Sequence, residues 1–181
     1  MPYYGREVGV TLDQLREICP SVGSLKMQKY LDDLNAAMEE FGITTPARQA
    51  AFIAQLAHES GGFRYVKELA SGEAYEGRAD LGNVEAGDGV RFKGRGLIQI
   101  TGRANYKACG EALGLDLLGT PEALEEPQNA CRSAAWFWDS RSLNELADAG
   151  DFRKITKRIN GGYTGWDDRV AYYERAKQVL A

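Results

Sequence analysis

Residues 50–57, AAFIAQLA, form an apolar run that is too hydrophobic for a surface helix, and the chain then continues His58-Glu59-Ser60-Gly61-Gly62. Glu59 therefore lies at the end of a helix that we expect to be buried, beside a flexible pair of glycines. A carboxyl group in such a place is a good candidate for a raised pKa. The segment thus predicts both a central helix and a functional acid.

The sequence also indicates where this helix begins. Thr45-Pro46 offers a capping hydroxyl followed by proline at the first helical position, so the helix is predicted to run from Pro46 to about Ser60. On a helical wheel Phe52, Leu56 and Glu59 share one narrow sector. Glu59 is then the polar tip of an inward-facing stripe.

A second carboxyl group, that of Glu68, follows nine residues after Glu59 in a more polar stretch. We expect it to be ionised. One protonated and one ionised carboxyl group are what glycosidic bond cleavage requires: one protonates the leaving oxygen and the other activates water. Glu73 and Glu76 lie on the same stretch and compete with Glu68 for the role of base.

The rest of the chain reads as helices around one glycine-rich segment. Residues 71–96 contain seven glycines and scattered acids, which is typical of a loop with short strands that folds over a site. We expect a mainly α fold with two lobes, a cleft between them and this loop as a flap. The predicted helices other than 46–60 cover residues 11–18, 24–41, 102 onward, 127–139, 142–149, 151–159 and 167–180.

Composition narrows the class of protein. With 181 residues, 44% hydrophobic and 27% charged, the chain is expected to form one soluble domain, 1–181. A net charge of -4 does not favour nucleic acid as a partner. One His and three widely spaced Cys argue against a zinc site, and no cofactor is expected. Three buried thiols are the default, with a single disulfide as the alternative.

The charged residues are distributed unevenly along the chain. Residues 151–181 hold seven Lys or Arg against four acids, which gives +3 there and leaves -7 for residues 1–150. A solvated helix face is the ordinary interpretation. The alternative is a weak anchor to anionic lipid or cell-wall polymer.

The first seven residues, MPYYGRE, lack the apolar core and the cleavage site of a signal peptide, and no run is long enough for a membrane span. We therefore expect the protein to be made in the host cytoplasm and to stay there until it is released to the periplasm and the cell wall.

Three segments point to one site: His58-Glu59-Ser60-Gly61-Gly62, residues 91–106 (RFKGRGLIQITGRANY), and Ile159-Asn160-Gly161-Gly162-Tyr163 followed by Arg169. Their order and spacing closely resemble glycoside hydrolase family 19, which includes plant-type chitinases and many phage endolysins. The resemblance runs from about Thr45 to Tyr173. It implies a lysozyme-like helical domain.

The resemblance also implies roles for single residues. Glu59 resembles the general acid, Glu68 the general base, and Thr101 the hydroxyl that holds the attacking water. Amides that bind sugar are implied at Gln99, Asn105 and Asn160. A cleft arginine that interacts with the catalytic carboxylates is implied at Arg169.

Other residues are assigned by local reasoning. The single histidine, His58, is expected to position the end of its helix rather than to react, and Arg95 is expected to support the site from behind. Thr101 could also cap the helix that follows it. Tyr75, Phe92 and Tyr163 flank glycine-rich loops and are candidates for stacking on sugars, whereas Trp136, Phe137 and Trp138 are expected in the core.

The leading hypothesis for function is a phage endolysin that hydrolyses β-1,4 bonds between amino sugars of bacterial peptidoglycan with inversion. Its partners would be the glycan strands and a holin that opens the membrane, and the protein is expected to be a monomer. A chitinase acting on poly-GlcNAc is the alternative within the same class. A lytic transglycosylase and a non-catalytic wall-binding module are further alternatives.

Overall fold

The computed structural model describes residues 9–181, so the prediction about the first seven residues lies outside the described part. The described chain is mainly helical. The α-helices in order are α1 (Leu12–Ile18), α2 (Ser24–Glu40), α3 (Pro46–Glu59), α4 (Asp88–Arg91), α5 (Arg103–Leu113), α6 (Pro127–Ser140), α7 (Leu143–Asp148), α8 (Phe152–Asn160) and α9 (Trp166–Leu180). Short 3-10 helices occur at η1 (Glu73–Tyr75), η2 (Ala79–Leu81) and η3 (Pro121–Glu125).

Local signals set several of these boundaries as predicted. The Thr11 hydroxyl accepts from the Gln14 amide in a capping box at α1, and the Thr45 hydroxyl accepts from the Arg48 amide at α3. Gly161, with φ of 80°, ends α8 in the left-handed conformation that glycine adopts without a steric penalty. The expected capping role of Thr101 is wrong, because α5 begins after Gly102 and has no side-chain cap.

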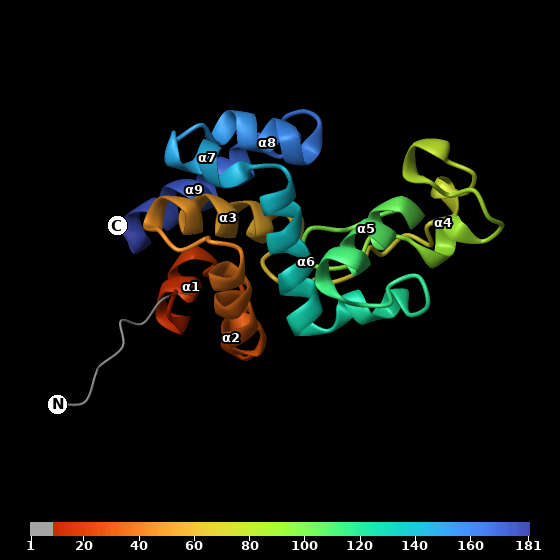
Figure 1. The fold of residues 1–181 in the computed structure, drawn as a ribbon. Coiled ribbons are helices and arrows are strands. Elements are labelled where there is room, and N and C mark those ends of the chain that lie inside the picture. Colours follow the sequence, from red (N-terminus) through yellow and green to blue (C-terminus); the bar gives the residue numbers. More distant parts are fainter. Residues whose placement is uncertain (1–8) are drawn as a thin grey trace.

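Two groups of elements flank α6 in Figure 1. We call α1–α3 with α7–α9 the helical lobe, and residues 64–126, which include α4 and α5, the loop lobe. The most extensive packing between helices joins α3 to α9 and α2 to α6. Helix α6 also contacts α5, so it connects the two lobes.

Helix α3 is central to the helical lobe, as its apolar sequence predicts. Every residue from Gln49 to Ala57 is buried, and Phe52 packs edge-on against the ring of Trp138 from α6.

Cys19, Cys109 and Cys131 are all buried and free, which confirms the default prediction of three buried thiols. Burial raises the pKa of the Cys19 and Cys109 thiols to about 12. No helix in residues 9–181 combines the length and the hydropathy that a membrane span requires.

The glycine-rich flap contains no regular strand in the described chain, only isolated bridges between Lys67 and Arg95 and between Arg95 and Ile100. Polar contacts hold it instead. The Glu76 carboxylate accepts from the amides of Gly87 and Gly89, at 2.8 and 3.1 Å. Buried Asp88 accepts two bonds from the Arg103 guanidinium, at 2.8 and 2.9 Å.

The Asp88–Arg103 pair should therefore contribute to stability in a pH-dependent way. Hydrogen bonds from Arg103 lower the pKa of Asp88, so its contribution is present above the ordinary aspartate pKa and is lost as pH falls through the lower folded value. We expect Asp88→Asn to reduce the free energy of unfolding by about 2 kcal/mol at pH 7, measured by urea denaturation.

The matched control is Asp80→Asn, because Asp80 pairs with Arg78 on the surface of the same flap and should change stability little. The deficit of the Asp88→Asn protein should persist from pH 7 to about 4 and shrink below that. A deficit that is unchanged at pH 3 would contradict this account.

Candidate active site

Glu59 ends α3 and is tied to α9 by a buried arginine. The Arg169 side chain, only 1% exposed, donates from Nη2 to Glu59 Oε1 at 2.7 Å. Its Nη1 donates to Gln55 Oε1 at 2.5 Å, and its Nε donates to the Thr164 carbonyl at 3.0 Å. Each of the three guanidinium nitrogens therefore donates a hydrogen bond, and the arginine holds the Glu59 carboxylate, which remains 21% exposed.

Gln55 belongs to this network and was not predicted. It lies one turn before Glu59 on α3, and its Nε2 donates to the buried hydroxyl of Thr156 on α8. The signal was present, since Gln55 is the one polar residue in the apolar run 50–57. Burial of an amide requires partners, and here the partners are Arg169 and Thr156.

His58 forms a second link between the same two helices. Its Nδ1 lies 2.7 Å from Asp168 Oδ2, and its ring packs directly on the backbone of Gly165, where a Cβ would lie 2.2 Å from Cε1. His58 and Asp168 neighbour Glu59 and Arg169 in sequence, so this contact lies beside the Glu59–Arg169 pair.

Glu68 is held by the loop lobe. Its Oε1 accepts from the Gly94 amide at 2.6 Å, and its Oε2 accepts from the Tyr75 hydroxyl at 3.0 Å. The backbone of Glu68 also donates to the Gly94 carbonyl at 2.9 Å. Both carboxylate oxygens thus face donors, which suits an ionised carboxylate.

Gly94 brings Glu68 close to two other predicted residues. A Cβ placed on Gly94 would lie 2.8 Å from Gln99 Oε1 and 3.3 Å from Thr101 Oγ1. The side-chain oxygens of Gln99 and Thr101 therefore gather around the residue whose amide binds Glu68. A side chain at position 94 would have to displace the Gln99 amide.

Thr101 and its neighbours line a small pocket of about 110 Å³. The Thr101 hydroxyl donates to the Gln99 carbonyl at 3.0 Å, and the Asn105 amide donates to the Thr101 carbonyl at 2.8 Å. The lining residues are Leu81, Gln99, Ile100, Thr101, Asn105, Trp136, Phe137 and Arg141. Three predicted site residues therefore meet in one hollow.

The competing glutamates have other positions. Glu76 is engaged with the amides of Gly87 and Gly89, whose hydrogen bonds lower its pKa. Glu73 is exposed at the start of η1. Of these three glutamates, Glu68 is the one hydrogen-bonded to Gly94, beside the side chains of Gln99 and Thr101.

Several aromatic residues differ from expectation. Phe92 is completely buried beside Tyr106, so the expectation that it stacks on sugar is wrong. Trp136 and Phe137 were expected in the core but are half-buried and line the pocket, whereas Trp138 is fully buried. Tyr75 has a contact that was not foreseen, its hydrogen bond to Glu68, and burial raises the pKa of its phenol.

Among residues 9–181, the side chains of Arg95, Asn160 and Tyr163 form no hydrogen bond with Glu59 or Glu68. Buried Arg95 pairs with Glu125 at 3.0 Å and donates to the Arg91 carbonyl, so it supports the segment that carries Gly94. Asn160 ends α8 with an exposed side chain. The Tyr163 ring, 37% exposed, lies under the Arg153 guanidinium.

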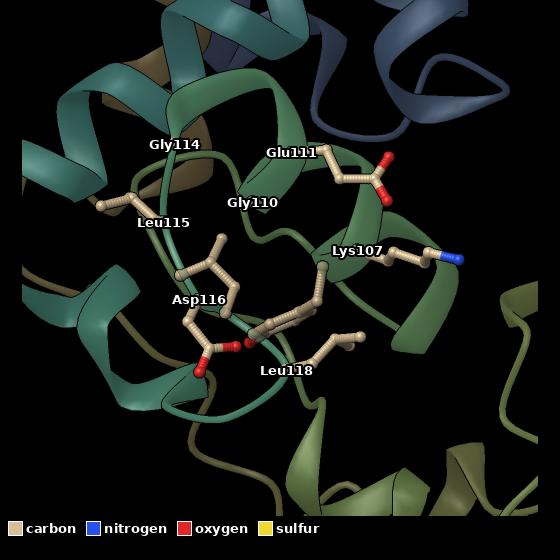
Figure 2. A pocket seen from close by; sticks show the side chains of 9 residues that line it. Lys107, Gly110, Glu111, Gly114, Leu115, Asp116 and Leu118 are labelled. Carbon is tan, nitrogen blue, oxygen red and sulfur yellow. The ribbon is translucent and has the colours of Figure 1, made fainter.

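A larger hollow of about 310 Å³ lies beside α5 and contains none of the predicted site residues (Figure 2). Lys107, Glu111 and Asp116 stand at its edges. Within residues 9–181, no group of three or more His, Cys, Asp or Glu side chains is arranged to hold a metal ion.

Comparison with known proteins identifies the family of the chain. The model of the family described as chitinase class I, glycoside hydrolase family 19, matches residues 36–151. A glycosyl hydrolase family 19 domain-containing protein from Haemophilus influenzae is 33% identical over 172 residues, which cover 77% of this chain and 84% of that protein. An Arabidopsis thaliana endochitinase is 36% identical over 167 residues, covering 90% of this chain.

The chain spans 56% of the length of that Arabidopsis endochitinase. Among solved structures, chitinase C from Streptomyces griseus superposes with a TM-score of 0.78 at 27% identity, covering 99% of this chain and 79% of that one. The chain therefore belongs to glycoside hydrolase family 19. It is a chitinase-like glycoside hydrolase with the family's helical, lysozyme-like fold.

The hydrogen bond from Tyr75 to Glu68 gives a prediction for the site. Tyr75→Phe removes one donor to the carboxylate and should lower kcat/KM about tenfold or more, because a hydrogen bond to a charged group contributes about 1.5–3 kcal/mol. Steady-state hydrolysis of a soluble chitooligosaccharide measures the change.

Tyr65→Phe is the control, because Tyr65 is 46% exposed and its hydroxyl has no protein hydrogen bond in the described chain. Equal rates for the Tyr75→Phe and wild-type proteins would show that the hydrogen bond has no part in the reaction.

Proposed function

We propose that this chain is an endolysin-type enzyme that hydrolyses β-1,4 bonds between amino sugars of bacterial peptidoglycan with inversion. Glu59 acts as general acid, Glu68 as general base, and the Thr101 hydroxyl orients the attacking water. The observation that carries the proposal is the different support of the two carboxylates. Arg169 fixes Glu59 in the helical lobe, while Gly94 and Tyr75 fix Glu68 beside Thr101.

The reaction follows from these positions. Glu68 takes a proton from water as the water oxygen bonds to the anomeric carbon, and Glu59 gives its proton to the leaving glycosidic oxygen. The bond between the anomeric carbon and that oxygen breaks, and the new reducing end has the inverted α configuration. The acid role requires a proton on Glu59, which Oε2 can carry while Oε1 keeps the hydrogen bond from Arg169.

Sugar binding is assigned to the amides near Thr101. Gln99 and Asn105 line the same pocket as Thr101, and amides can bind hydroxyl and acetamido groups without adding charge. Asn160 offers a further amide at the end of α8, and the exposed part of the Tyr75 ring offers an apolar face. Chain 1–181 acts as one catalytic domain in this proposal.

A chitinase acting on poly-GlcNAc is the second candidate, and the endochitinases among the relatives favour it. Peptidoglycan is preferred because the chain carries a cationic face. The side chains of Arg153, Lys154, Lys157 and Arg158 are exposed on α8 and form no ion pair with any described residue. Such a face suits an anionic envelope that a holin has opened to the enzyme.

The catalytic assignment predicts the effect of neutral replacements. Glu59→Gln and Glu68→Gln should each lower release of reducing ends from purified peptidoglycan by a factor of about 100 to 10,000. Glu73→Gln is the control, since it removes an exposed carboxylate from the same flap. If Glu73→Gln loses as much activity as Glu68→Gln, the base is wrongly assigned.

Mass spectrometry of the products separates the remaining alternatives. Hydrated reducing ends are expected, whereas anhydro-sugar ends would indicate a lytic transglycosylase. Release of sugar products from colloidal chitin, without any release from peptidoglycan, would make poly-GlcNAc the preferred substrate. Unchanged lysis by Glu59→Gln would show that Glu59 is not the acid, and binding to the wall without any hydrolysis by the wild-type protein would indicate a wall-binding module.

The cationic face of α8 gives a separate prediction. Replacing Arg153, Lys154, Lys157 and Arg158 by Gln should slow lysis of outer-membrane-permeabilised cells severalfold at low salt, and the effect should fade near 0.15 M salt as charges are screened. Cleavage of purified peptidoglycan should not change.

The Arg158 guanidinium also donates to the Arg141 carbonyl at 3.0 Å, so a triple variant that keeps Arg158 controls for local disturbance. An equal loss in both assays by the triple variant would contradict a role for this charge in approach to the envelope.

A further inference from the structure

Arg141 differs from most half-buried arginines of this chain because it has no carboxylate partner. Its guanidinium lies 3.5 Å above the Phe137 ring, and its one side-chain hydrogen bond runs from Nη1 to Ser140 Oγ at 3.1 Å. Within residues 9–181, no carboxylate oxygen lies within 4.0 Å of its nitrogens. Burial without such a partner lowers the pKa of Arg141.

Most other buried or half-buried arginines of the described chain are paired with a carboxylate. Five such arginines each form an ion pair: Arg48, Arg95, Arg103, Arg132 and Arg169. Arg175 has no carboxylate partner among residues 9–181 either, but its Nε donates to the Ile18 carbonyl and it does not line the pocket. Arg141 combines an unneutralised charge with a position in the pocket of Thr101.

The surroundings fix how this guanidinium is presented. Phe137 covers one of its faces, so its N–H groups remain available at the edge. Gln99, Thr101 and Asn105 line the same pocket of about 110 Å³. The pocket therefore places neutral amide and hydroxyl groups, which suit sugar oxygens, beside a single planar cation.

A neutral sugar polymer does not require that cation. Desolvating an arginine is unfavourable unless an opposite charge is bound, and a planar guanidinium matches a carboxylate with two parallel hydrogen bonds. A strand of GlcNAc alone carries no carboxylate, whereas peptidoglycan carries carboxylates on its stem peptides, and on its lactyl ethers wherever the peptide has been removed.

We propose that Arg141 is a specificity-determining residue that binds a carboxylate carried by the glycan strand beside the sugar held at Gln99, Thr101 and Asn105. The inference rests on the proposed function, because it requires that the physiological strand be anionic. The size of the pocket favours a carboxylate attached close to the sugar ring over one at the end of a long peptide.

The experiment compares Arg141→Gln with wild type on two soluble polymers with the same backbone, anionic carboxymethyl chitin and neutral glycol chitin. We expect kcat/KM to fall about tenfold or more on carboxymethyl chitin, mainly through KM, and to stay within about twofold on glycol chitin. Arg141→Lys keeps the charge without the planar fork and should recover part of the loss.

Lys26→Gln is the matched control, since it removes a positive charge from an exposed site on α2, outside the pocket and outside the cationic face of α8. Its effect on both polymers should be small. Equal losses on both polymers by Arg141→Gln would indicate a structural role or contact with a neutral group, and no loss on either would show that Arg141 does not contact substrate. Both results overturn the inference.

Peptidoglycan itself then identifies the source of the carboxylate. Intact sacculi present stem-peptide carboxylates, whereas strands stripped of peptides by an amidase expose the lactyl carboxylate. We expect the larger loss for Arg141→Gln on the stripped strands; a loss confined to intact sacculi would assign the contact to the stem peptide. Failure of the wild-type enzyme on both forms would overturn the proposed function, independently of the result with the two chitin derivatives.

Discussion

The buried guanidinium of Arg169 is the contact on which the site in the helical lobe depends. Arg169 lies in α9, is 1% exposed, and binds Gln55 and Glu59 of α3. A buried cation is tolerated only when it is paired and fully hydrogen-bonded. The packing of α3 against α9, the most extensive between helices here, therefore includes Glu59 as a structural partner as well as a proposed acid.

The second carboxylate depends on a different kind of support. Glu68 lies on a loop, and its position comes from the Gly94 amide and the Tyr75 hydroxyl rather than from a helix. Polar contacts of Glu76, Asp88 and Arg103 in turn hold the loops that surround η1 and α4. An irregular segment can place a base accurately when its backbone groups are bound in this way.

Much of this arrangement could be predicted from the sequence because the signals are local. The hydroxyls of Thr11 and Thr45 cap their helices, and the apolar run before His58 identifies the buried α3. The contact between Arg169 and Glu59 was implied by the family resemblance, and the structure contains it. The family itself is confirmed by comparison.

The remaining features depend on approaches between distant segments, which no local pattern reports. Trp136 and Phe137 resemble core residues in sequence, yet they line a pocket because residues 99–101 pack beside the end of α6. Phe92 flanks glycines but is buried beneath α5 by Tyr106. Tyr75 contacts Glu68 only because the loop turns back at Gly72, whose φ of 91° favours glycine.

In the proposed reaction, two carboxyl groups act on opposite faces of one sugar, with water between Glu68 and the anomeric carbon. The anomeric configuration of the first product, followed by proton NMR during hydrolysis of a chitooligosaccharide, tests this arrangement. We expect the α-anomer to appear first and then to mutarotate. Initial formation of the β-anomer would mean retention, and would contradict the assignment of Glu68 as the base that activates water.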